Sequence, residues 1–219
     1  MQTANHSSHP RIDPARPLVI VDVDEVLGLF MLGFARFVAE HGYELRLERF
    51  ALFQNLYRQG ETQAVDMETG RNLFNEFFRI GAEEMETAPH AVESLAILSG
   101  GASVVILTNA PDHARAPRAR WLARHGMDYP LIINEGPKGG AVAALAAQTS
   151  GPVAFIDDLI PNLDSAAQAA PHVHRFQLVA DPRLAKLAPS APDRHARIDH
   201  WPTLRGEITR VLGLSPPAP

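Results

Sequence analysis

The chain has 219 residues, of which 46% are hydrophobic and 21% are charged, a balance that indicates a globular protein and excludes disorder over most of the chain. Its 20 Lys and Arg residues against 25 Asp and Glu residues give a formal net charge of -5, so no excess of positive charge is available to bind a nucleic-acid polymer or a membrane surface. The absence of cysteine excludes disulfides, thiolate metal sites and a cysteine nucleophile. Because no apolar run approaches the roughly 20 residues that span a bilayer, and the N-terminal segment lacks the pattern of a signal peptide, a cytoplasmic protein is expected.

The predicted elements begin after a polar segment, residues 1–16, which has no hydrophobic period and is expected to be a flexible tail. Short apolar runs without alternation then predict strands that are buried on both faces of a sheet. These runs are Leu18–Val21, Val104–Leu107, Leu131–Ile133 and Val153–Ile156, with a weaker strand at Val173–Val179. Helical patterns at His113–His125 and Ala141–Gln148 lie between the strands, and this alternation favours an α/β fold with a doubly wound parallel sheet.

A long insert separates the first predicted strand from the second. Residues 29–92 contain no convincing strand pattern, and their Phe residues recur at helical spacing, as Phe30 and Phe34 do. The insert therefore predicts a small all-helical domain, while residues 17–28 and 93–213 form the α/β core. Most of the chain's aromatic residues fall in the insert, where we expect them chiefly to form its core, with one or two lining a pocket.

Two carboxylates follow the first strand directly, at Asp22 and Asp24. Ligands bind beyond the carboxyl ends of the strands in open α/β sheets, so a pair at this place suits chemistry on a bound molecule. Two solvated aspartates in a turn explain the same pair equally well when it is taken alone.

Other polar groups stand at the end of the second strand and before a later helix. Thr108 and Asn109 offer a hydroxyl, an amide and backbone N–H groups that could hold an anionic oxygen. Lys138, in Gly-Pro-Lys-Gly-Gly, could bring a positive charge to a phosphate. Each of these residue types is more often an ordinary surface group, so none is decisive by itself.

The fourth strand ends in a second carboxylate pair, Asp157 and Asp158, followed by Asn162. Adjacent carboxylates repel one another, which is tolerable in water or beside a cation, so a buried pair would favour a metal ion. His172 and His174 also have a spacing that could chelate a metal, but without a third ligand nearby they are interpreted as two surface histidines.

Taken in chain order, these motifs resemble the four motifs of the haloacid dehalogenase-like (HAD) superfamily of phosphatases and phosphotransferases. The resemblance covers about residues 17–165, and the insert after the first motif is similar to the helical cap that the family inserts there. It implies a Rossmann-like core in which Asp22 attacks phosphorus and forms an aspartyl-phosphate. Asp24 would protonate the leaving oxygen and then activate the water that hydrolyses the intermediate.

The resemblance also implies a Mg2+ cofactor and a phosphate site. Asp22, the backbone carbonyl of Asp24 and Asp158 would hold the ion, with Asp157 and Asn162 organising its surroundings. The groups implied to bind the phosphoryl oxygens are Thr108, Asn109 and Lys138.

The substrate is the least defined part of the interpretation. Glu25 occupies a position that is very often glycine in the family, and its carboxylate either disfavours highly charged substrates or points to solvent. A small phosphorylated metabolite is expected; a nucleotide is one candidate, because the short helical cap is similar to that of the deoxyribonucleotidases, and sugar and glycolate phosphates are others. Arg58, in the polar stretch 58–63, is the candidate substrate contact, with an ordinary solvated loop as the alternative.

The rival interpretation from another functional class is a non-catalytic binding or scaffold protein that has the same fold. The intact set of clustered carboxylates argues against it, because a protein without catalysis has no need of charges that repel one another. The sequence does not predict the oligomeric state.

Overall fold

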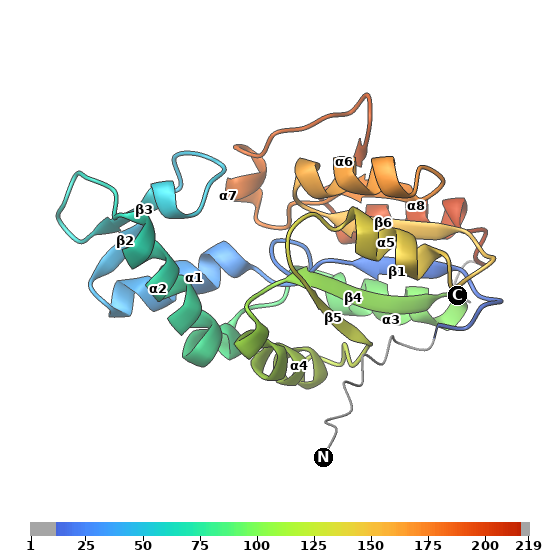
Figure 1. Ribbon diagram of the computed structural model, residues 1–219, viewed down its shortest axis with the longest axis horizontal. Coiled ribbons are helices and arrows are strands. Elements are labelled where there is room, and N and C mark those ends of the chain that lie inside the picture. The colour runs from blue at the N-terminus through green and yellow to red at the C-terminus, as the bar shows by residue number, and fades with distance from the viewer. Residues whose placement is uncertain (1–11, 216–219) are drawn as a thin grey trace, which may run out of the picture.

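In the computed structural model, which describes residues 12–215, six strands form one sheet in the order β5-β4-β1-β6-β7-β8, with every neighbouring pair parallel (Figure 1). The predicted strands are confirmed as β1, β4, β5, β6 and β7, whereas the two-residue β8 has no pattern that predicts it. The bounds are β1 (Leu18–Val21), β4 (Ser103–Asn109), β5 (Leu131–Asn134), β6 (Val153–Asp157), β7 (His174–Gln177) and β8 (Ala196–Arg197).

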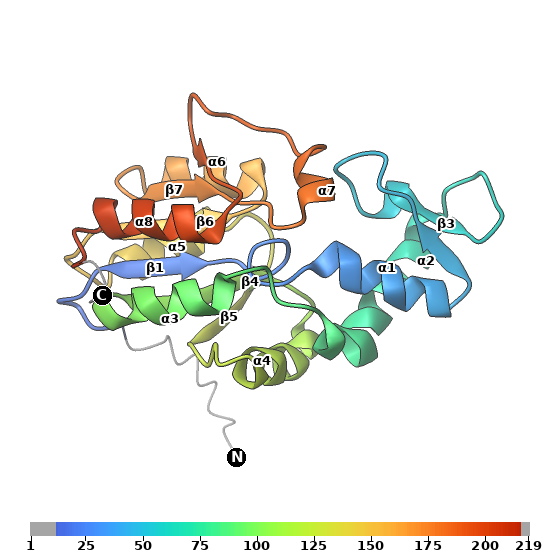
Figure 2. The same ribbon diagram turned by 180° about the vertical axis from the view of Figure 1, so that it is seen from behind.

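Helices cover both faces of this sheet, as Figures 1 and 2 show from opposite sides. Ile20 and Phe155 pack toward α5 and α6, while Val19 and Ile106 pack toward α3, α4 and α8. Since successive side chains of a strand point to opposite faces and both faces are buried, the strands appear in the sequence as uninterrupted apolar runs. The helices are α3 (Ala91–Gly101), α4 (Arg115–Arg124), α5 (Gly139–Ala146), α6 (Ile160–Ala169), α7 (Pro182–Ala185) and α8 (Trp201–Val211).

The register of the central strands brings their carboxyl ends to one edge. Val21, the last residue of β1, pairs with Ile106 of β4 on one side and with Ile156 of β6 on the other. The backbone continues the pairing for one more residue, because the amide of Asp22 donates to the carbonyl of Ile156 at 3.0 Å. The residues that follow β1 and β6 are therefore held side by side.

A second unit, here called the cap, lies beyond this edge and is formed by the insert after β1 (Figures 1 and 2). It contains α1 (Phe30–Glu40), β2 (Tyr43–Leu45), β3 (Leu56–Arg58) and α2 (Met67–Glu76), then the π-helix η2 (Phe77–Gly81), with single turns η1 (Phe53–Asn55) and η3 (Ala82–Glu84). The prediction of an all-helical insert is wrong, because β2 and β3 form an antiparallel pair with Tyr43 opposite Arg58. Two strands of three residues that include Glu44 and Arg58 are too short and too polar to give a strand pattern.

Stacked and edge-on aromatic rings form the interior of the cap. The ring centroid of Phe77 lies 5.4 Å from that of Phe30, 5.5 Å from that of Phe34 and 5.5 Å from that of Phe37. All four side chains are buried. The expectation that the aromatic residues chiefly supply the core of a small domain is confirmed for these rings.

The flexible N-terminal tail predicted for residues 1–16 does not extend as far as residue 16. Residues 1–11 lie outside the described part of the chain, but Ile12 is buried against the same side of the sheet as Leu18 and Val142. The amide of Ser150 also donates to the carbonyl of Pro14 at 3.0 Å, so residues 12–16 pack on the core. Within residues 12–215 no helix is long and apolar enough to cross a bilayer, and the cytoplasmic location stays a prediction.

Candidate active site

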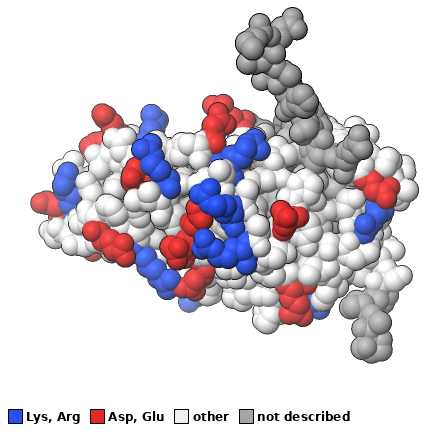
Figure 3. All heavy atoms as spheres, turned by 90° about the horizontal axis from the view of Figure 1, so that it is seen from below, with Lys and Arg blue, Asp and Glu red and all other residues white. Residues whose placement is uncertain are grey.

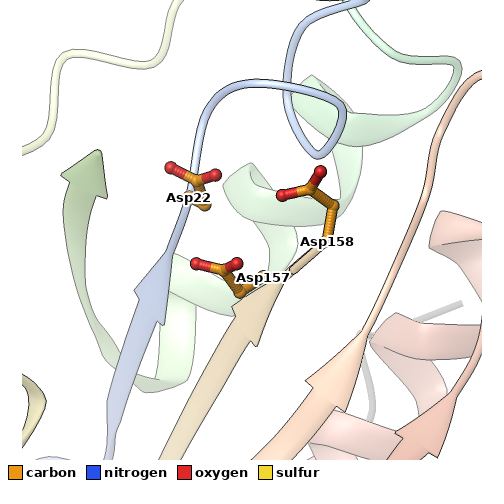
Figure 4. A group of neighbouring side chains, drawn as sticks. All are labelled: Asp22, Asp157 and Asp158. Carbon is orange, nitrogen blue, oxygen red and sulfur yellow. The ribbon is translucent and has the colours of Figure 1, made fainter. Parts of the chain in front are cut away.

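Three buried carboxylates meet beyond the ends of β1 and β6. Asp22 follows β1, Asp157 is the last residue of β6, and Asp158 follows it. Their carboxylate oxygens lie within 4.8 Å of one another, around one space at the edge of the sheet (Figure 4). Parallel pairing of β1 with β6 is what brings together two aspartate motifs that are more than 100 residues apart in the chain.

Lys138 supplies one positive charge to this cluster. Its ammonium nitrogen lies 2.7 Å from Oδ1 of Asp22 and 2.7 Å from Oδ2 of Asp157, and its side chain is 1% exposed. Burial acts to lower the pKa of Lys138, but the two carboxylates outweigh burial and raise that pKa above its ordinary value. The lysine is therefore a fixed cation at neutral pH.

The backbone before α5 explains how Lys138 reaches the carboxylates. Lys138 is the N-cap residue of α5, and the next residue, Gly139, approaches α6 very closely. A Cβ atom on Gly139 would lie 2.3 Å from the carbonyl oxygen of Ser165, so only glycine permits this contact between α5 and α6.

Asp157 is held by donors on several sides. Its Oδ1 accepts hydrogen bonds from the amide of Leu159 at 2.9 Å and from Nδ2 of Asn162 at 3.0 Å, while its Oδ2 faces Lys138. Asn162 thus orients Asp157. The pKa of Asp158 is raised well above its ordinary value, first by burial and then by the neighbouring Asp157 and Asp22 carboxylates.

The donor set fits a divalent cation. Three buried carboxylates face one ammonium group, which leaves negative charge uncompensated in a dry environment. Clustered carboxylate oxygens are the ligands that Mg2+ prefers in proteins, and such a cation would offset the repulsion that raises the pKa of Asp158.

Asp24 is half-buried and is held by an arginine that the sequence analysis does not identify. Nη2 of Arg118 donates to Oδ1 of Asp24 at 2.7 Å and to Oδ2 at 2.8 Å. The guanidinium carbon of Arg118 also lies 5.0 Å from the ring centroid of Phe78 in the cap. Burial raises the pKa of Asp24, and Arg118 opposes that shift.

A sequence signal for Arg118 does exist, although it is weak. Arg118 is buried and shares the inner face of α4 with Pro117, Trp121 and Leu122, at helical spacing. A charged residue on an otherwise apolar helical face is a candidate for a buried ion pair. Three exposed arginines of the same helix, Arg115, Arg120 and Arg124, make its apolar face hard to recognise in the sequence.

Glu25 does not point to solvent, and its carboxyl group is held at the start of the cap. It has a left-handed backbone with φ of 59°, a conformation that favours glycine, and it is buried. Its Oε1 accepts a hydrogen bond of 2.7 Å from the amide of Met31 in the first turn of α1, so the carboxyl group satisfies an amide at the N-terminus of this helix. Burial raises the pKa of Glu25 to about 7, against the opposing effect of the Met31 hydrogen bond.

Thr108 and Asn109 end β4 beside this cluster. Thr108 is fully buried, and its hydroxyl oxygen has no hydrogen-bond partner among the described residues. Nδ2 of Asn109 donates to the carbonyl of Gly136 at 2.9 Å, and its Oδ1 accepts from Nδ2 of Asn134 at 2.8 Å. The side chain of Asn109 is therefore held in place by the loop after β5.

A cavity of about 260 Å3 opens above the carboxylates, between the core and the cap. Asp22, Asp24, Lys138 and Asp158 form part of its wall, and Asn109 lines it as well. The structure thus brings these predicted site residues to one space, with Asp157 directly behind them.

Arg58 does not line this cavity. It stands at the end of β3, where its guanidinium carbon lies 5.2 Å from the ring centroid of Tyr43, and it borders a separate hollow with Glu61 and Asp66. The cap contributes instead Phe50 and Leu52, from the loop between β2 and η1. The sequence favours Arg58 for its charge in a polar stretch, but this stretch follows β3 and borders the separate hollow.

Comparison with known proteins was made by sequence and by structure. No protein-family model matches the sequence, and no curated protein matches it. Solved structures of the haloacid dehalogenase-like group do match, among them a hydrolase of this group from Streptococcus pneumoniae, with a TM-score of 0.60 at 12% identity over 89% of this chain and 99% of that one.

Two further solved structures match at similarly low identity and high coverage. YfnB from Bacillus subtilis, described as a HAD-hydrolase bound to magnesium, has a TM-score of 0.55 at 15% identity over 92% of this chain and 100% of that one. A HAD-superfamily hydrolase of subfamily IA from Geobacter sulfurreducens has a TM-score of 0.53 at 17% identity over 93% and 100%. The chain therefore has the haloacid dehalogenase-like fold, as the order of its motifs predicts.

Proposed function

We propose that this protein is a Mg2+-dependent phosphomonoester hydrolase that acts through an aspartyl-phosphate on Asp22. The observation that carries the proposal is the ion-paired cluster of Asp22, Lys138 and Asp157, with Asp158 beside it and Asp24 two residues beyond the nucleophile. A small phosphorylated metabolite is the proposed substrate class.

Asp22 is placed to act as the nucleophile. A carboxylate can attack phosphorus at neutral pH without a base, and the contact between Lys138 and Oδ1 of Asp22 fixes its orientation. Lys138, together with the free hydroxyl of Thr108 and the fixed amide of Asn109, would bind the phosphoryl oxygens and offset the charge that they gain in the transition state.

Asp24 would perform the proton transfers. As an acid it protonates the leaving oxygen, and as a carboxylate it then takes a proton from the water that hydrolyses the aspartyl-phosphate. Arg118 keeps the carboxyl group of Asp24 at the wall of the cavity during both steps.

Asp22, Asp157 and Asp158, with the backbone carbonyl of Asp24, would hold the magnesium ion, which when bound neutralises charge on the phosphoryl group. The structural neighbours include a protein described as a dehalogenase, with a TM-score of 0.52 at 15% identity over 90% of this chain and 98% of that one. An acid at Asp24 favours the phosphatase alternative here, because a halide leaving group needs no proton.

The test is hydrolysis of acetyl phosphate and p-nitrophenyl phosphate with Mg2+ and with a chelator. We expect turnover that needs Mg2+ and that is lost in Asp22→Asn, because an amide cannot form the acyl phosphate. The matched control is Asp128→Asn, which changes an exposed carboxylate in the loop before β5 and should leave activity unchanged. Equal activity of Asp22→Asn and the wild-type protein would exclude the mechanism.

A further inference from the structure

The cavity above Asp22 has two chemically different sides. On its core side the carboxylates and Lys138 line it, with Leu159 beside them. The opposite wall is apolar and is formed by Phe30 and Met31 of α1, Phe50 and Leu52 of the following loop, Phe74 of α2, and Leu184 of α7. A phosphoryl group placed at Asp22 would therefore direct its leaving group against hydrocarbon and aromatic surface.

The charges around the cavity do not favour a second anion. Among the described residues that line it, Lys138 is the one Lys or Arg, and its ammonium group already contacts Asp22 and Asp157. Glu25 also lines the cavity and supplies a carboxyl group where a substrate anion would need a cation.

The residues around the neighbouring hollow also disfavour a second anion. This hollow shares Phe74 and Asn109 with the cavity, and its ionisable lining residues are Asp112 and Glu135. A leaving group that extends out of the cavity along this path would meet two more acidic side chains, so an anionic extension is disfavoured there as well.

The volume limits how much of the leaving group the cavity can enclose. An apolar cavity of about 150 Å3 is large enough to bind benzene. The 260 Å3 available here must hold the phosphoryl group as well, which leaves space for about one ring or a short branched chain. A nucleoside, with both a ribose and a base, would extend beyond this space and would also bring several hydroxyl groups to an apolar wall that offers them few partners.

We propose that the substrate is a monophosphate ester of a compact, uncharged and mainly apolar alcohol, the size of one aromatic ring or a short branched chain. This inference rests on the proposed phosphatase function and specifies its substrate class. It differs from the nucleotide, sugar and glycolate phosphates considered from the sequence, because each of those carries several hydroxyl groups or a second charge.

The experiment compares esters of primary alcohols, whose leaving groups differ little in intrinsic reactivity. The apolar set is benzyl phosphate and isobutyl phosphate; the polar set is glycerol 3-phosphate, phosphoglycolate and adenosine 5'-monophosphate. We expect kcat/KM for the better apolar ester to exceed that for every polar ester by about tenfold or more, the scale on which an apolar pocket discriminates. Acetyl phosphate, which is small and intrinsically reactive, is the reference for activity.

A variant tests the role of the wall itself. Leu52→Arg places a cation in a partly exposed position of the cavity, and we expect it to raise the ratio of phosphoglycolate to benzyl phosphate kcat/KM by about tenfold. Leu52→Gln, which is polar but uncharged, is the matched control at the same position. Ile80→Arg adds the same cation at a cap position that is 61% exposed and should not change the ratio.

The outcomes separate the inference from the proposed function. Turnover of acetyl phosphate with a preference for any of the polar esters would overturn the inference and leave the phosphatase function standing. No turnover of any compound, acetyl phosphate included, would overturn both. If Leu52→Arg does not fold, the order of the wild-type kcat/KM values decides alone.

Discussion

At the scale of single residues, Arg118 and Glu25 connect the site to its surroundings. Arg118 reaches from α4 to Asp24 and lies against Phe78 of the cap, so one core side chain contacts both the proposed acid and the cap. Glu25 joins the loop after β1 to α1 through the amide of Met31. Each of them is a charged residue that is buried and makes a specific contact instead of facing solvent.

Arg118→Met should impair proton transfer to the leaving group, because Asp24 loses the donor that orients its carboxyl group. General acid catalysis contributes about 10²–10⁴-fold, so we expect a loss of about 100-fold in kcat for phenyl phosphate and a clearly smaller loss for 2,4-dinitrophenyl phosphate, whose leaving group needs no proton. Steady-state kinetics on the two esters measures the difference. Arg120→Met, on the exposed side of the same helix, is the control, and equal losses for both esters would contradict a positioning role.

Glu25 predicts a pH-dependent stability in the metal-free protein. Its pKa is about 7 in the folded chain against an ordinary value of 4.5, so the folded state binds more protons between these values and the stabilising effect of protonation is lost as the pH rises through 7. Glu25→Gln cannot lose that proton, so its stability relative to the wild-type protein should increase from pH 5 to pH 8, by up to about 3 kcal/mol. Chemical denaturation with a chelator present measures this change. A difference that is constant with pH would show that Glu25 is charged throughout.

At the scale of secondary structure elements, the cap depends on its aromatic interior. Phe77→Ala removes a ring that is 1% exposed and contacts four other rings, so we expect a loss of about 3–5 kcal/mol in the free energy of unfolding of the cap. Urea denaturation followed by circular dichroism gives this value. Met67→Ala, at a cap position that is 50% exposed, should cost far less, and similar losses in the two variants would contradict a packed aromatic core.

The elements that the sequence predicts well are those whose pattern depends on burial alone. β1 and β6 are covered on both faces and therefore appear as continuous apolar runs, and the carboxylates that follow them mark the edge where they end. The β2–β3 pair is missed because its strands are three residues long and partly exposed. The pairing of Arg118 with Asp24 joins residues 94 positions apart, and no local pattern specifies such a contact.

At the scale of the whole molecule, the cap is joined to the core by two segments that lie side by side. The amide of Leu29 donates to the carbonyl of Glu86 at 2.9 Å, and the amide of Ala88 donates to the carbonyl of Leu27 at 2.8 Å. Ion pairs add a second link, since Arg124 of α4 lies 3.2 Å from Glu83 of η3. Figure 3 shows Lys and Arg side chains near the middle of one face with Asp and Glu side chains beside them, in keeping with such surface pairs.

The paired segments suit a hinge, and we predict that the cap moves relative to the core. We expect the cap to close when a phosphate mimic is bound, because closure excludes water from the carboxylate cluster. Adding Mg2+ with beryllium fluoride should reduce the radius of gyration in small-angle X-ray scattering and should slow amide exchange in the loop of Phe50 and Leu52. An unchanged radius and unchanged exchange under saturating conditions would indicate a cap that is fixed on the core.

The central claim is that Asp22 becomes phosphorylated during turnover. The most direct measurement is to mix the protein with acetyl phosphate and Mg2+, stop the reaction with acid, reduce the acyl phosphate with borohydride and locate the product by peptide mass spectrometry. We expect homoserine at position 22, because Asp22 is the carboxylate that both contacts Lys138 and lines the cavity. Homoserine at Asp24, Asp157 or Asp158 instead, or hydrolysis without modification of any aspartate, would contradict it.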